Sequence, residues 1–122
     1  MRGSSGGWAR YAIERWRLLL RWRELADIVA RACRDVLGGR CVSVYVVGGA
    51  AEDRLTVLSD IDVVIVVDDA GLKTLDTILR IRRRAEELGL PEDAPIDVKV
   101  LTGEELERLK RRKIYRRTVR IL

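Results

Sequence analysis

The sequence predicts an α/β (α+β) domain in which helices flank a small mixed central sheet. Three short runs rich in β-branched residues, at 41–47, 61–67 and 95–101, have the length and composition of strands. Helical periodicity precedes the first run and also follows the second and third runs. A chain of 122 residues fits one compact domain. We expect a single domain over 8–122 and treat residues 1–7, MRGSSGG, as a flexible leader or tag remnant.

The first predicted element is a long amphipathic helix over 8–37. Its apolar residues recur every three or four positions, and Gly38-Gly39 ends it. The stripe comprises Trp16, Leu19, Trp22, Ala26, Val29, Cys33 and Val36. Leu18, Leu20 and Leu25 lie off this stripe and form a second apolar surface. We therefore expect the helix to contact another chain, in a homo-oligomer or a hetero-complex.

The next two strands surround a pair of glycines. The run CVSVYVV at 41–47 leads directly into Gly48 and Gly49, which predicts a strand followed by a tight corner. A short helical turn and a loop are expected over 50–59. The run IDVVIVV at 61–67 is almost continuously apolar, which indicates a strand buried on both faces.

The C-terminal half continues the alternation of helix and strand. Asp68 and Asp69 end the second strand and are expected to cap a helix over 72–88. After the third strand, Thr102 and Glu105 have the spacing of a capping box for a helix that begins at Gly103. The final residues, TVRIL, fit a short edge strand or an extension of that helix.

The composition excludes several kinds of chemistry. The chain has no histidine, which removes histidine general bases, Ser-His-Asp triads and His-ligated zinc. Cys33 and Cys41 cannot form a zinc site alone. We expect two buried thiols, and a disulfide is the alternative that a hyperthermophilic source would favour. No apolar run reaches the ~20 residues that a membrane span needs, and no secretory leader is seen, so we expect a soluble cytoplasmic protein.

The net charge of +5 is unevenly distributed along the chain. Residues 1–43 carry 9 basic and 4 acidic side chains, residues 44–102 carry 7 and 12, and residues 103–122 carry 8 and 3. An acidic middle between two basic ends suits anionic ligands, nucleic acid among them, or a charge-matched partner. A solvated arginine-rich surface explains the pattern equally well.

Two carboxylates stand at the start of the second strand, in the sequence SDID. Asp60 and Asp62 are two residues apart in an extended segment, so both side chains leave the same face. Because neighbouring carboxylates repel each other, we expect a cation between them. Asp97 has a similar setting on the third strand, and three such carboxylates would suit Mg²⁺ or Mn²⁺. Lys99 shares the face of Asp97 and is expected to pair with it.

These motifs together resemble a known family. A glycine pair ends a strand, ten residues follow, Asp-x-Asp opens an apolar strand, and a third Asp lies on a later strand. This pattern resembles the nucleotidyltransferase fold shared with DNA polymerase beta. The short chain is similar to the minimal nucleotidyltransferases of that superfamily over roughly residues 24–105. The resemblance implies a polymerase beta-like core preceded by the long N-terminal helix.

The resemblance also implies a role for each residue. The catalytic and metal-binding set is Asp60, Asp62 and Asp97, and the substrate-binding set is Gly48, Gly49 and Ser59. In the family the third carboxylate helps to activate the acceptor hydroxyl. Two positions depart from the pattern, since Gly49 stands where Ser is usual and Glu52 where many minimal members have Arg. Both changes weaken the grip on phosphate.

The function implied is that of a magnesium-dependent nucleotidyltransferase. It would transfer a nucleoside monophosphate from a nucleoside triphosphate, ATP by expectation, to a hydroxyl acceptor. The family further suggests a HEPN-type partner, with this chain as the antitoxin of a HEPN/MNT toxin–antitoxin pair. Two alternatives stay open. One is a nucleotide-binding antitoxin or regulatory protein with weak or no turnover, and the other is an enzyme that acts on a nucleic-acid end or a small molecule.

Overall fold

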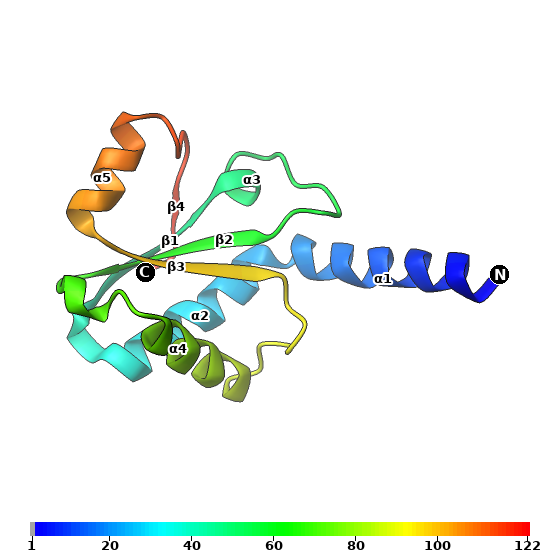
Figure 1. Cartoon of the computed structure of the whole chain (residues 1–122), viewed down its shortest axis with the longest axis horizontal. Coiled ribbons are helices and arrows are strands. Elements are labelled where there is room, and N and C mark those ends of the chain that lie inside the picture. Colours follow the sequence, from blue (N-terminus) through cyan, green and yellow to red (C-terminus); the bar gives the residue numbers. More distant parts are fainter. Residues whose placement is uncertain (1) are drawn as a thin grey trace.

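A computed structural model describes residues 2–122. Its longer helices are α1 (Arg2–Leu20), α2 (Trp22–Leu37), α4 (Leu75–Glu87) and α5 (Gly103–Arg111), and a single short turn forms α3 (Gly48–Ala51). The strands are β1 (Cys41–Val47), β2 (Ile61–Val67), β3 (Ile96–Thr102) and β4 (Val119–Arg120) (Figure 1). Two short 3-10 turns are η1 (Gly38–Arg40) and η2 (Ala70–Leu72). Within this described part of the chain, no helix is long and apolar enough to cross a membrane.

The four strands form one mixed sheet in the order β3-β2-β1-β4. Strand β1 runs antiparallel to both β2 and β4, whereas β2 and β3 are parallel. Parallel strands need a crossover, and α4 provides it. The C-terminal residues form an edge strand, in which Val119 pairs with Val46. The predicted α/β class with a mixed, helix-flanked sheet is therefore confirmed.

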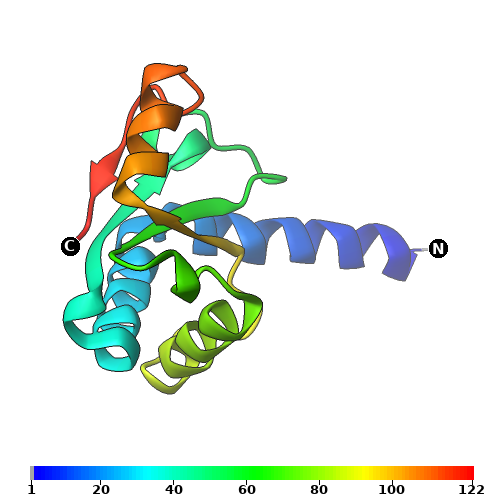
Figure 2. The same cartoon turned by 60° about the vertical axis from the view of Figure 1, so that its left-hand side comes forward.

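Two apolar layers cover the two faces of the sheet. Helices α2 and α4 pack on one face, and α5 packs on the other (Figures 1 and 2). Strand β2 supplies side chains to both layers in alternation: Val63, Ile65 and Val67 join the α2/α4 side, and Val64 and Val66 join the α5 side. All five are at most 5% exposed, as the continuous apolar run predicted.

The predicted single helix over 8–37 is two helices. Arg21 leaves helical geometry, with φ −94° and ψ 22°, and separates α1 from α2. On a straight helix, Leu19 and Leu25 would point about 120° apart, because they are six residues apart at 3.6 residues per turn. The break lets both side chains reach the core, where each is 0% exposed. Helix α1 also begins at Arg2, inside the segment that the sequence suggested was a leader.

This break changes which residues are exposed. The prediction that Leu18 and Leu25 lie on a second surface is wrong, because Leu25 is buried and Leu18 packs against the core. Trp16, expected in the core stripe, is 36% exposed, and Leu20 is 61% exposed as predicted. An exposed apolar surface on α1 is therefore present but is composed of different residues.

Two further expectations need correction. Asp69 does not cap the main helix, since its carboxylate accepts a hydrogen bond from Gly71 N in η2, and Thr74 caps α4 instead. Cys33 and Cys41 are not two free thiols but form a disulfide, because the turn between α2 and β1 brings their Cα atoms to 6.0 Å. The capping box of Thr102 and Glu105 is present as predicted.

Candidate active site

The sheet register brings two predicted carboxylates side by side. Asp62 on β2 and Asp97 on β3 are direct partners in the parallel pair. Both strands begin at the same edge of the sheet, so their first residues lie together there. Asp60 immediately precedes β2 at that edge. The three carboxylates expected from SDID and from the third strand thus share one edge.

Asp62 is the most enclosed of the three carboxylates. Partial burial raises its pKa, the neighbouring Lys99 ammonium opposes this shift, and the charges of Asp97 and Asp60 add to it. The pKa of Asp62 therefore responds to both other carboxylates. Negative charge is concentrated at this edge of the sheet.

Lys99 pairs with Asp97, as its position two residues along the strand predicted. The Nζ atom donates to Oδ2 of Asp97 at 2.8 Å. This hydrogen bond is the main cause of a raised pKa for Lys99, and the charges of Tyr115 and Asp62 add to the effect. A cation thus already stands among the carboxylates.

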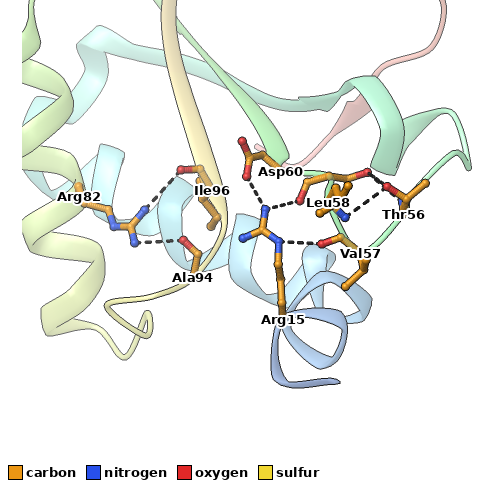
Figure 3. Close-up of polar contacts among 9 residues, drawn as sticks. Arg15, Thr56, Val57, Leu58, Asp60, Arg82, Ala94 and Ile96 are labelled. Atoms are coloured by element: carbon orange, nitrogen blue, oxygen red, sulfur yellow. Dashed lines mark hydrogen bonds and ion pairs between the residues drawn. The ribbon is translucent and has the colours of Figure 1, made fainter. Parts of the chain in front are cut away.

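Arg15 is a site residue that no motif in the sequence indicated. From α1 it donates to the carbonyl of Val57 at 2.8 Å, to the carbonyl of Ser59 at 2.7 Å and to Oδ1 of Asp60 at 2.8 Å (Figure 3). Its side chain is only 18% exposed, whereas that of Asp60 is 55% exposed. The partners lie more than forty residues away in the chain, so no local pattern in the sequence could have indicated the contact.

The glycine corner lies directly against Asp62. Gly48 has φ +67°, a left-handed conformation that favours glycine, and a Cβ there would overlap Oδ2 of Asp62. Gly49 is less restricted, since a Cβ there would lie 3.5 Å from the carbonyl oxygen of Arg54. Ser59 is part of the loop between α3 and β2, where its hydroxyl accepts a hydrogen bond from Thr56 N at 2.9 Å.

Glu52 adds a further carboxylate just after this corner. One oxygen accepts a hydrogen bond from Arg54 at 3.0 Å, and the side chain is 12% exposed. The other oxygen, Oε2, is buried without a hydrogen-bond partner among the described residues. Negative charge therefore lies where many minimal nucleotidyltransferases are expected to have a cation.

Comparison with known proteins identifies the family. The model of the nucleotidyltransferase domain matches residues 26–121, which is most of the chain. The chain belongs to the nucleotidyltransferase domain family. A crystal structure of a candidate nucleotidyltransferase from Sulfolobus solfataricus has a similar fold, with a TM-score of 0.60 and 21% identity over 90% of this chain and 85% of that chain. A search among curated proteins finds no match.

The match confirms the resemblance to the polymerase beta-like nucleotidyltransferases. It covers the glycine corner, the SDID motif and Asp97, and it begins within α2. Helix α1, including Arg15, precedes the matched region. The contact between Arg15 and Asp60 thus links the family domain to a segment outside it.

Nucleotidyltransferases typically use a divalent metal, and the donor chemistry of this site fits one. Three carboxylates share one sheet edge, and oxygen-only ligation of this kind suits Mg²⁺ or Mn²⁺. As the side chains lie, no three acidic or cysteine side chains in residues 2–122 are grouped closely enough to hold an ion. Asp60 and Asp97 are instead turned to basic partners, Arg15 and Lys99.

Proposed function

We propose that this nucleotidyltransferase transfers a nucleoside monophosphate from a nucleoside triphosphate to a hydroxyl acceptor, with ATP as the donor. The observation that carries the proposal is the register of β2 and β3, which pairs Asp62 with Asp97 beside the glycine corner. Carboxylates for a metal and backbone N–H groups for a phosphate are the two parts that metal-assisted phosphoryl chemistry needs.

The proposal assigns each residue a task. Asp60, Asp62 and Asp97 would hold Mg²⁺ or Mn²⁺, which when bound would stabilise charge on the α-phosphate and lower the pKa of the acceptor hydroxyl. The backbone N–H groups around Gly48 and Gly49 would donate to the triphosphate, and Ser59 would support the nucleotide from the neighbouring loop. Asp97, the more exposed partner of Asp62, would accept the proton of the acceptor hydroxyl.

The direct test is transfer of label from α-phosphate-labelled ATP in the presence of magnesium. Candidate acceptors are a HEPN-type partner protein, nucleic-acid ends and small hydroxyl compounds. We expect label on one acceptor class with the wild type and none with Asp62→Asn. ATP binding without transfer to any acceptor would overturn the enzymatic proposal.

A second candidate is a nucleotide-binding antitoxin or regulatory protein with little turnover. Glu52 favours it, because a carboxylate with one unpartnered buried oxygen beside α3 repels a triphosphate at the glycine corner. In that case, the chain would bind and mask a HEPN-type toxin without modifying it. Complex formation that survives Asp62→Asn, with no label on the partner, would distinguish this function from transfer.

A nucleic-acid acceptor is favoured by the basic C-terminal segment. Residues 108–120 contain eight Arg or Lys side chains and no acidic one. Tyr115 in this segment lies close enough to Lys99 to affect its pKa, which places this one residue of the segment near the carboxylate edge. Label on RNA or DNA ends that falls steeply with added salt would support this acceptor.

A further inference from the structure

Two arginines reach from helices to the loops that lead into the carboxylate-bearing strands. Arg15 of α1 holds the loop before β2, and Arg82 of α4 holds the loop before β3 (Figure 3). Arg82 donates to the carbonyls of Glu92 at 2.9 Å and Ala94 at 3.2 Å, and it also pairs with Glu86. Each guanidinium therefore fixes the backbone at the entrance of one strand.

Only Arg15 also contacts a carboxylate of the site. The same terminal nitrogen bonds the Ser59 carbonyl and Oδ1 of Asp60, while its Nε bonds the Val57 carbonyl. Among the described residues, Oδ2 of Asp60 accepts no hydrogen bond. Arg15 thus holds one oxygen of the carboxylate and leaves the other free.

The orientation of the Arg15 guanidinium toward Asp60 is fixed by its other hydrogen bonds. A planar guanidinium that bonds two backbone carbonyls has one orientation, and these two backbone contacts of Arg15 are partly buried. The hydrogen bond from this fixed guanidinium favours one orientation of the Asp60 carboxylate. Hydrogen bonds from outer groups to a ligating carboxylate usually orient that carboxylate for its metal.

We infer that Arg15 is a positioning residue that orients Asp60 for a divalent metal and couples α1 to the site. The inference rests on the proposed function only in taking Asp60 as a metal ligand. Arg15 lies on α1, which precedes residues 26–121, so this contact is made by a segment outside the part of the chain that the family model matches.

Two effects of Arg15 on the metal oppose each other. Its positive charge repels a cation, whereas its hydrogen bonds hold the ligand in place. If positioning dominates, Arg15→Ala should weaken Mn²⁺ binding by about 10- to 100-fold, the usual range for loss of an outer-shell partner. If repulsion dominates, the same change should strengthen binding. The sign of the effect therefore decides the inference.

The experiment measures Mn²⁺ affinity of the full chain by electron paramagnetic resonance, without nucleotide. Arg15→Lys keeps the repelling charge but loses the planar fork, so its affinity for Mn²⁺ should also fall below that of the wild type. This milder variant decides the outcome if the alanine variant unfolds. In an Asp60→Asn background, Arg15→Ala should not weaken Mn²⁺ binding any further, because the carboxylate that Arg15 positions is gone. Equal or tighter binding by the Arg15 variants, or an undiminished effect in the Asp60→Asn background, would overturn the inference.

Arg82→Ala is the matched control for loss of a loop clamp. It should lower the melting temperature much as Arg15→Ala does. Because Arg82 does not contact Asp60, any effect of Arg82→Ala on Mn²⁺ affinity should be the same in the wild type and in the Asp60→Asn background. Arg84→Ala, which removes a surface pair with Asp35, should leave Mn²⁺ affinity unchanged. If the wild type itself binds no Mn²⁺, the proposed metal site fails together with the inference. If the wild type binds Mn²⁺ and the Arg15 variants bind it equally well, only the inference about Arg15 fails.

Discussion

At the scale of single residues, the glycine corner and Asp62 are one structural unit. The left-handed backbone at Gly48 turns the chain out of β1, and the absence of a side chain there leaves room for the Asp62 carboxylate. A residue with a Cβ at this position would be unfavourable for two reasons: its backbone would be strained at a positive φ, and its Cβ would overlap the Asp62 carboxylate. The corner thus restricts where the Asp62 carboxylate can lie.

Gly48→Ala should therefore disturb the site more than Gly49→Ala. We expect Gly48→Ala to destabilise the fold by about 1 kcal/mol or more, because alanine strains the positive φ, and to weaken Mn²⁺ binding by displacing Asp62. Gly49→Ala, whose Cβ would make an ordinary contact, is the control and should change neither quantity appreciably. Urea denaturation and Mn²⁺ titration measure the two effects, and equal behaviour of the two variants would contradict the argument.

Asp62 should destabilise the metal-free protein. Its pKa is raised by burial and by Asp97 and Asp60, so the ionised form is disfavoured in the folded state above that pKa, and the penalty is relieved as the pH falls. Asp62→Asn should raise the melting temperature without metal at neutral pH. It should also abolish the increase that we expect from magnesium or manganese binding to the folded wild type. Differential scanning fluorimetry with and without metal tests both, and a metal response unchanged in Asp62→Asn would contradict the site assignment.

At the scale of elements, α5 is fixed at its N-terminus by a cap and an ion pair. Thr102 and Glu105 bond each other's backbone N–H groups, and Lys73 from the segment after η2 donates to Glu105 at 2.5 Å. The bond from Lys73 is the main cause that lowers the pKa of Glu105 to about 2, with the Thr102 backbone N–H next. The cap thus links α5 to the opposite side of β3.

This depressed pKa predicts a loss of stability in acid. Glu105 stabilises the fold fully above its ordinary pKa of 4.5, and the contribution is lost as the pH falls toward about 2. Glu105→Gln keeps the capping geometry but should flatten the decrease in stability over this range. Thr102→Ala, which removes the cap, should cost about 1 kcal/mol at neutral pH. Urea unfolding at several pH values measures both, and an identical pH profile for Glu105→Gln would rule out the assigned role.

The disulfide joins α2 to β1 across the turn at η1. Cys33 is 0% and Cys41 2% exposed, and eight positions separate them. Closing so short a loop in the unfolded chain should stabilise the fold by about 2–3 kcal/mol in the chain-entropy account. The double change Cys33→Ala and Cys41→Ala should lower the urea midpoint accordingly. Reductant should lower the midpoint of the wild type but not that of the double variant, and a wild type insensitive to reductant during unfolding would contradict the expectation.

At the scale of the whole molecule, α1 extends away from the body of the domain. Its N-terminal half projects beyond the sheet in both views (Figures 1 and 2). Ile13, Trp16 and Leu20 are 53%, 36% and 61% exposed and are spaced by three and four residues, as in a helix-helix seam. Arg10 and Arg17 lie beside this seam. An exposed apolar surface of this kind usually marks an interface.

We expect the isolated protein to associate through this seam with a second copy. Because Arg10 and Arg17 would be present on both copies, added salt should screen their repulsion and strengthen the association. Light scattering coupled to size exclusion should show a dimer that Ile13→Glu and Leu20→Glu convert to a monomer, whereas Leu79→Glu on exposed α4 surface should not. A monomer at every salt concentration would contradict self-association and indicate that the seam binds a different protein. If that protein presents an acidic helix, its binding should weaken as the salt concentration rises.

The sequence by itself determined the family of this protein and most of its secondary-structure elements. Periodicity and β-branched runs placed β1 and β2 at their observed bounds and β3 within one residue, because local patterns reflect which faces are buried. The glycine pair, SDID and Asp97 indicated the nucleotidyltransferase family. Only the tertiary structure decided the break at Arg21, the disulfide and the contact between Arg15 and Asp60. These depend on where the core and the site lie in space, and residues as far apart in the chain as Arg15 and Asp60 carry no local signal of their contact.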